Sequence, residues 1–98
     1  MIPYLLQLLS GMLLTNGLPH FLHGVSGDPF PSPFTRPIGV ALSPPPVNVA
    51  WGFANLLGGA LLLVYFTPVS YAGWVVFCAG SLLFGLRLSR RFARRHAR

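Results

Sequence analysis

The strongest pattern in this chain is an apolar run from position 47 to position 86, in which Thr67-Pro68 is the one strong helix breaker. No Asp, Glu, Lys or Arg occurs in this run. A helix needs roughly 20 apolar residues to cross the hydrocarbon core of a bilayer, and residues 47–66 and 69–86 each approach that length. Because the connection is short, the pattern predicts two antiparallel helices, a transmembrane hairpin.

A third apolar run begins at the N-terminus and predicts a membrane helix over about 3–24, kinked near Pro19. Proline removes one backbone hydrogen bond and clashes with the preceding turn. A cleaved signal peptide is the competing interpretation, but the run lacks a basic start and a small-residue cleavage site. This segment is the most polar of the three, because it contains Gln7, Asn16 and His20.

Residues 25–46 hold seven of the ten prolines, which excludes a regular helix and favours extended segments and turns. We expect this loop to press onto the membrane surface or a partner, with Phe30 and Phe34 inward. The predicted fold is therefore a single all-α transmembrane domain, 1–98, with three transmembrane helices over about 3–24, 47–66 and 69–94.

Composition and charge agree with a membrane location. The chain has 98 residues, of which 53% are hydrophobic and 8% charged, whereas soluble domains carry about 25% charged residues. All seven basic residues are arginines, and six of them follow the last apolar run. Such a flank is typical of the cytoplasmic side of an inner membrane. It predicts a cytoplasmic C-terminus and argues against nucleic acid as the partner. Three crossings would place the 25–46 loop, with Arg36, on the same side.

The arginine-rich tail repeats at helical spacing, so the last helix is expected to continue with one basic stripe. This stripe would contact anionic lipid headgroups, or alternatively an acidic partner. Its members are Arg87, Arg90, Arg91, Arg94, Arg95 and Arg98.

Small residues recur at four-residue spacing on the two later helices. In a membrane, such stripes let helix backbones approach closely. They could be used within the hairpin, but three short helices cannot hide every stripe, so packing against another integral membrane subunit is also expected. The candidate packing residues are Ala50, Ala54, Gly58, Ser81 and Gly85.

The weak candidates for ligand binding are His20 and His23, which lie three residues apart and can share one helical face. Two histidines with one acid, Asp28, make a poor metal site, because structural zinc takes four ligands. The single Cys78 cannot form an internal disulfide. We therefore expect no metal and no cofactor, and instead hydrogen bonding that closes the Pro19 kink and holds the loop.

Two further segments, Asn16-Gly17-Leu18-Pro19-His20-Phe21 and Val47-Asn48-Val49-Ala50-Trp51-Gly52, together with Gly24–Gly27 and Pro31–Phe34, resemble short uncharacterised bacterial inner-membrane proteins. The resemblance covers about half of the chain and implies a bacterial multi-span protein with no assigned activity.

No catalytic signature is present in the sequence, so an enzyme is not expected. The favoured function is a small structural or accessory subunit at the edge of a larger membrane complex, of the respiratory or photosynthetic type for example. The alternative is a small homo-oligomeric transporter or channel. That function would need polar residues along a path at mid-span, and the available ones are Gln7, Asn16, Asn48 and Asn55.

Overall fold

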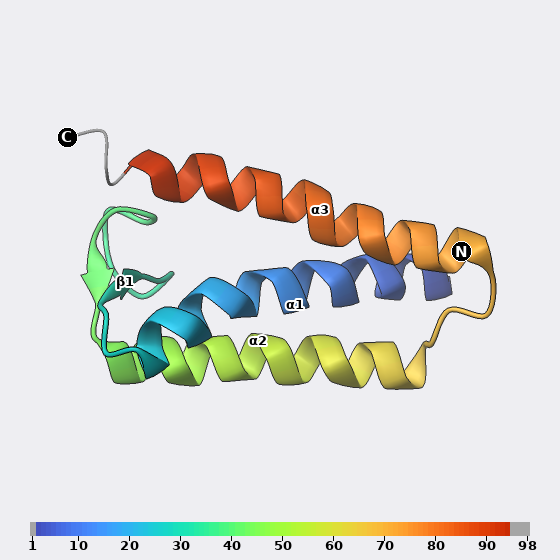
Figure 1. Cartoon of the computed structure of the whole chain (residues 1–98), viewed down its shortest axis with the longest axis horizontal. Helices are drawn as coiled ribbons and strands as arrows, with labels where there is room; N and C mark the ends of the chain where they lie inside the picture. Colours follow the sequence, from blue (N-terminus) through green and yellow to red (C-terminus); the bar gives the residue numbers. More distant parts are fainter. Residues whose placement is uncertain (1, 95–98) are drawn as a thin grey trace.

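The computed structural model describes residues 2–94 and consists of three long helices and a short two-stranded pairing. Helix α1 spans Ile2–Val25, α2 spans Pro45–Tyr65 and α3 spans Tyr71–Ala93. Figure 1 shows α1 lying between the other two, so that α2 and α3 both pack on α1. The last two helices are antiparallel, as predicted, but α1 lies between them, so the hairpin that they form is open.

The prediction of three transmembrane helices is also wrong. Two helices, α2 and α3, are long and apolar enough to cross a membrane, and α1 does not qualify. The physical reason is visible in α1, where Gln7, Ser10 and His20 are all buried against the other helices. These polar residues lower the hydropathy of the segment, and they serve contacts inside the bundle rather than with lipid. The topology based on three crossings therefore has no support.

The helix boundaries follow local chemistry. Helix α1 continues through Pro19 without interruption. Helix α2 begins earlier than predicted, at Pro45, because proline suits the first helical positions, where its missing N–H would be unpaired in any case. Helix α3 begins at Tyr71 rather than at 69, since the Ser70 hydroxyl caps it by accepting a hydrogen bond from the Gly73 backbone N–H.

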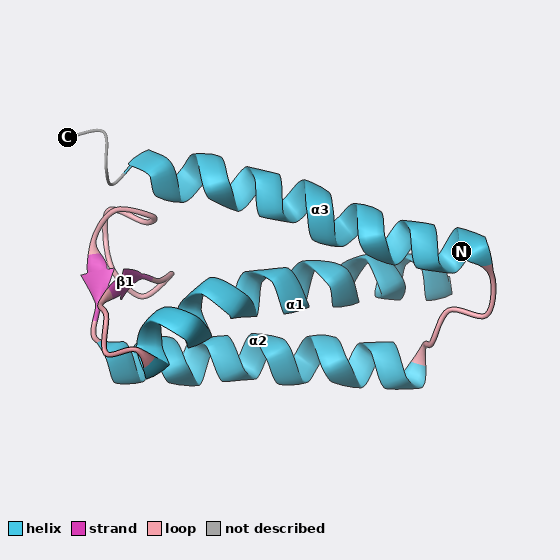
Figure 2. Ribbon diagram, viewed as in Figure 1, coloured by secondary structure: helices cyan, strands magenta, loops and turns pink. Residues whose placement is uncertain are grey.

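The proline-rich loop is ordered by a small antiparallel pairing of β1 (Phe30–Pro31) with β2 (Leu42–Ser43), in which Phe30 faces Ser43. Figure 2 shows the loop and its strands at one end of the bundle, where α1 ends and α2 begins. Phe30 is buried as expected, but Phe34 is 63% exposed, so only one of the two phenylalanines points inward.

The interior of the described chain is polar and its surface is apolar. The buried hydrophobic side chains are Phe30 and Leu88, whereas the large exposed ones occur along all three helices. Helices approach closely where glycine faces backbone: a Cβ on Gly80 of α3 would lie 2.6 Å from the Leu8 carbonyl oxygen of α1. The buried polar residues are Gln7, Ser10, His20, Ser32, Ser43, Asn48 and Asn55.

Candidate functional site

Asn48, in the first turn of α2, connects α1 to the proline-rich loop. Its side chain is fully buried, and its Nδ2 amide donates to the backbone carbonyls of Phe30 (2.8 Å) and Ser43 (3.2 Å). Its Oδ1 atom lies 2.9 Å from His20 Nδ1. Because this oxygen can only accept, Nδ1 of the imidazole carries the proton and donates. In the neutral ring, Nε2 is then left with a free lone pair.

The His20 ring is enclosed by aromatic side chains from three different elements. The rings of Phe30, Trp51 and Phe92 lie 5.3, 6.5 and 5.9 Å from it, all edge-on. His20 is 2% exposed, and it belongs to α1, outside the two candidate membrane spans. Burial lowers the pKa of the imidazole; the hydrogen bond that His20 donates to Asn48 opposes this effect, and the nearby His23 adds to it. His20 is therefore neutral at pH 7.

His20 and His23 do not form a shared site. Each imidazole instead contacts the Phe30 ring. It stacks on His23 at a centroid distance of 4.2 Å and meets His20 edge-on. His23 is instead directed to Asp28, whose carboxylate oxygen lies 3.9 Å from Nδ1 at a solvent-exposed position. Within residues 2–94, no group of three or more His, Cys, Asp or Glu side chains could hold a metal ion.

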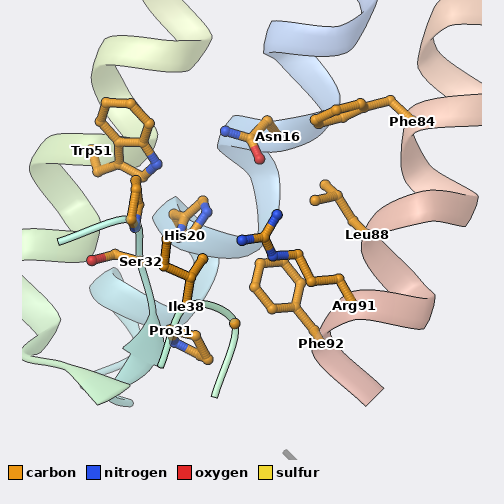
Figure 3. A pocket seen from close by; sticks show the side chains of 12 residues that line it. Asn16, His20, Pro31, Ser32, Ile38, Trp51, Phe84, Leu88, Arg91 and Phe92 are labelled. Carbon is orange, nitrogen blue, oxygen red and sulfur yellow. The ribbon is translucent and has the colours of Figure 1, made fainter. Parts of the chain in front are cut away.

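A cavity of about 120 Å³ opens beside His20, beneath the loop and between the three helices. Figure 3 shows the imidazole of His20 and the guanidinium of Arg91 directed toward the same space, with Asn16 above them. Apart from Ser32, the other walls are apolar and come from Trp51 and Phe92 together with loop residues. Side chains from four separate parts of the chain thus meet at one small cavity.

Arg91 reaches this cavity across Gly39 of the loop. Gly39 is buried and has a φ of +82°, and a Cβ there would lie 3.1 Å from both Cγ and Nε of Arg91. Within residues 2–94, the Arg91 guanidinium has neither a hydrogen bond nor an ion pair. The Arg91 cation therefore lies at a largely apolar cavity with no acceptor among the described residues.

The other predicted arginines lie on one surface, as the spacing indicates. Arg87, Arg90, Arg91 and Arg94 line a shallow basic groove together with Leu83 and Leu86. Arg95 and Arg98 lie outside the described residues.

The predicted packing residues divide into two groups. Ala50 and Ala54 are exposed on the side of α2 away from α1, and Gly58 makes an ordinary contact with Leu13. On α3, Ser81 and Gly85 face α1: the Ser81 carbonyl accepts a hydrogen bond from the Thr15 hydroxyl, and a Cβ on Gly85 would lie 3.4 Å from Thr15 Cγ2. The stripe of α3 is used inside the bundle, whereas Ala50 and Ala54 of the α2 stripe face outward.

A second set of polar contacts joins α1 to α2 further along the bundle. The Asn16 amide donates to Asn55 Oδ1 (3.0 Å), and the Ser10 hydroxyl donates to the Gly59 carbonyl (2.7 Å). Neither these contacts nor the role of Asn48 was predicted from the sequence. The signal for them is the spacing of Asn48, Gly52, Asn55 and Gly59, which places all four on one face of α2.

At the opposite end of the bundle, Gln7 donates from Nε2 to the Phe66 carbonyl oxygen at 3.0 Å. Its Oε1 atom is buried with no hydrogen-bond partner among the described residues. The site near His20 is thus the place where titratable groups, aromatic rings and a cavity coincide.

Comparison with known proteins adds no assignment to this geometry. No protein-family model, no curated protein sequence and no solved structure matches the chain.

Proposed function

We propose that this chain is a small non-catalytic accessory subunit that packs within a larger membrane protein complex. The observation that carries the proposal is the inverted distribution of polarity, with hydrogen-bonded polar residues inside and large apolar side chains outside. In water, so much exposed apolar surface would favour aggregation. In a bilayer it is the expected surface, because lipid accepts apolar side chains and polar groups must find partners within the protein.

The proposed location is the inner membrane of a bacterium, with α2 and α3 crossing as an open hairpin around α1. Helix α2, at 21 residues, extends roughly 32 Å at 1.5 Å per residue, which matches a hydrocarbon core of about 30 Å. The loop that contains Arg36 lies at the same end of the bundle as the arginines of α3, since its Gly39 lies against Arg91. The preference of basic residues for the cytoplasmic side supports a cytoplasmic orientation for that end.

The outward face of α2 supports contact with another integral membrane subunit. Ala50 and Ala54 are exposed one turn apart, and small residues on a lipid-facing surface allow a partner helix to approach closely. The basic groove formed by Arg87, Arg90 and Arg94 would then meet anionic headgroups or an acidic surface of the partner.

A homo-oligomeric channel or transporter is the second candidate, and the geometry supports it less. Such a function needs polar groups free to contact the solute. Gln7, Asn16, Asn48 and Asn55 are instead hydrogen-bonded to one another or to backbone carbonyls.

The test is native mass spectrometry of the chain purified from its own membrane in a mild detergent. We expect a defined complex with other membrane subunits, which is lost in Ala54→Leu because added bulk would separate the two helices. Phe53→Leu, a change at a neighbouring exposed position of α2, serves as the control and should keep the complex. A homo-oligomer, or a monomer in every preparation, would contradict the accessory role.

A further inference from the structure

The cavity beside His20 combines features that a purely structural contact does not require. Two of its polar groups, the His20 imidazole and the Arg91 guanidinium, are directed into the same 120 Å³ space. The remaining walls are largely aromatic or aliphatic. Pockets that bind small molecules show this combination, in which apolar walls enclose a few convergent polar groups.

The donor and acceptor pattern indicates what the cavity accepts. Arg91 offers planar N–H donors and has no acceptor within residues 2–94, so it fits an oxyanion bound by two parallel hydrogen bonds. His20 donates through Nδ1 to Asn48, which leaves Nε2 as an acceptor. A ligand that satisfies both groups must carry a negative oxygen and, beside it, a hydroxyl that donates.

We propose that this cavity binds a phosphate group that carries a P–OH, either free phosphate or a phosphate monoester, with Arg91 holding its charged oxygens and His20 Nε2 accepting the hydrogen bond of its P–OH. A carboxylate supplies the negative oxygens but no donor for Nε2, and a phosphodiester lacks the hydroxyl. The cavity is lined by Arg91 and by residues of the proline-rich loop, at an end of the bundle where either a lipid headgroup or free phosphate could enter. The lipid source rests on the proposed membrane location, whereas binding of free phosphate does not.

The loop contributes by positioning the cation. Gly39 lies directly against the Arg91 side chain, and its positive φ is a conformation that side-chain-bearing residues rarely adopt. Alanine at this position would strain the loop and meet Arg91 Cγ and Nε. Gly39 is therefore a positioning residue, which leaves space for the arginine to cross into the cavity.

Trp51 provides a direct readout, because its indole lines the cavity, whereas Trp74 lies in the first turn of α3 at the opposite end of the bundle. The experiment records the fluorescence of the full chain, with Trp74→Phe as background, in nanodiscs. In one arm, inorganic phosphate is added to phosphatidylcholine discs. In the other arm, phosphatidylcholine discs are compared with discs that contain increasing phosphatidic acid.

The matched variants are Arg91→Gln and Arg90→Gln, which remove the same charge from adjacent residues, one at the cavity and one outside it. We expect a saturable change in Trp51 emission that weakens at least about tenfold in Arg91→Gln and is retained in Arg90→Gln. Far-UV circular dichroism confirms that both variants keep their helices, and Gly39→Ala offers a second perturbation that preserves every charge.

The outcomes separate the sources and the alternatives. Saturation with inorganic phosphate identifies free phosphate as sufficient, and saturation with phosphatidic acid alone identifies the lipid headgroup; either result supports the site. Equal weakening in Arg90→Gln and Arg91→Gln would mean that the tail attracts anions only by its overall charge. That result, or acetate binding as tightly as phosphate, or no response in either arm, would overturn the proposal. None of these outcomes depends on whether the chain joins a larger complex.

Discussion

At the scale of single residues, Asn48 is the side chain on which the loop depends. It is hydrogen-bonded to two loop carbonyls and to the His20 imidazole at once, so its loss removes three hydrogen bonds from buried groups. We expect Asn48→Ala to lower the free energy of unfolding by about 2–4 kcal/mol, since each of these three hydrogen bonds contributes about 0.5–1.5 kcal/mol. Equilibrium unfolding in detergent, followed by Trp51 fluorescence, measures this change.

The comparison variant is Asn16→Ala, which removes a hydrogen bond at a less buried position. Its expected cost is about 1 kcal/mol. Equal losses from the two substitutions would show that Asn48 is not the main attachment of the loop.

His20 should tolerate an amide but not an alkyl group. In His20→Gln, the side-chain N–H can still donate to Asn48 Oδ1, and the loop should keep its protection against hydrogen exchange. In His20→Leu, this oxygen would be buried without a donor, and exchange in residues 30–43 should rise at least tenfold. If Gln and Leu variants exchange alike, the imidazole has a role other than hydrogen bonding.

Burial of His20 also predicts a pH dependence. Because its folded-state pKa lies below the ordinary 6.5, the unfolded chain binds the proton more tightly. The contribution of His20 to stability is therefore complete above about pH 6.5 and is lost as the pH falls below that value. Phosphate-free unfolding experiments between pH 7.5 and pH 5 should show this loss, and it should be smaller in His20→Gln. A stability that rises on acidification would contradict the assignment.

At the scale of elements, the glycine faces determine how closely α1 approaches α2. A Cβ on Gly59 would lie 2.8 Å from Leu14 Cγ and 3.0 Å from the Leu14 backbone nitrogen, whereas one on Gly58 would lie 3.6 Å from Leu13 Cδ1. We expect Gly59→Ala to destabilise the bundle by about 1–3 kcal/mol through overpacking. Gly58→Ala is the matched control and should be neutral or slightly stabilising, because alanine favours the helix. Similar stabilities for both variants would contradict the packing.

The boundaries of the helices could be predicted from the sequence, but their arrangement could not. The three helices were predicted to within two residues at each end, because apolar runs and prolines mark them directly. The arrangement of the helices was not predicted, because the mean hydropathy of a helix does not show which of its sides faces a neighbouring helix. In α1, Ser10 and His20 lower the mean hydropathy, and both face the inside of the bundle. These buried polar residues argue against a third membrane crossing, and they fit the position of α1 between α2 and α3.

The candidate site was predicted in part for a similar reason. His20 could be singled out because ionisable residues are rare in this chain. Asn48, Gly39 and Trp51 could not, since their relation to His20 depends on contacts across 19 to 31 positions of the sequence that no local spacing encodes. The division between His20 and His23 is likewise tertiary, because it follows from Phe30 of the loop lying against both rings.

At the scale of the whole molecule, the chain forms a bundle with polar contacts inside and apolar side chains outside. One end carries the proline-rich loop and the described arginines, and the other carries the turn between α2 and α3. If α2 and α3 cross the bilayer, these two ends lie on opposite sides of the membrane. The position of the loop, the basic groove and the cavity beside His20 relative to the membrane all follow from this arrangement.

The most direct measurement of this central claim is the labelling of single cysteines in sealed, inverted inner-membrane vesicles. Cys78 is first replaced by alanine, because it is a free, exposed thiol, and Arg36→Cys and Ser70→Cys are then introduced separately. If α2 and α3 cross the membrane, an impermeant maleimide labels Arg36→Cys in intact vesicles, and labels Ser70→Cys only after the vesicles are permeabilised. Labelling of both positions in intact vesicles would show that α2 does not cross the membrane, and would contradict the proposed membrane crossing of α2 and α3.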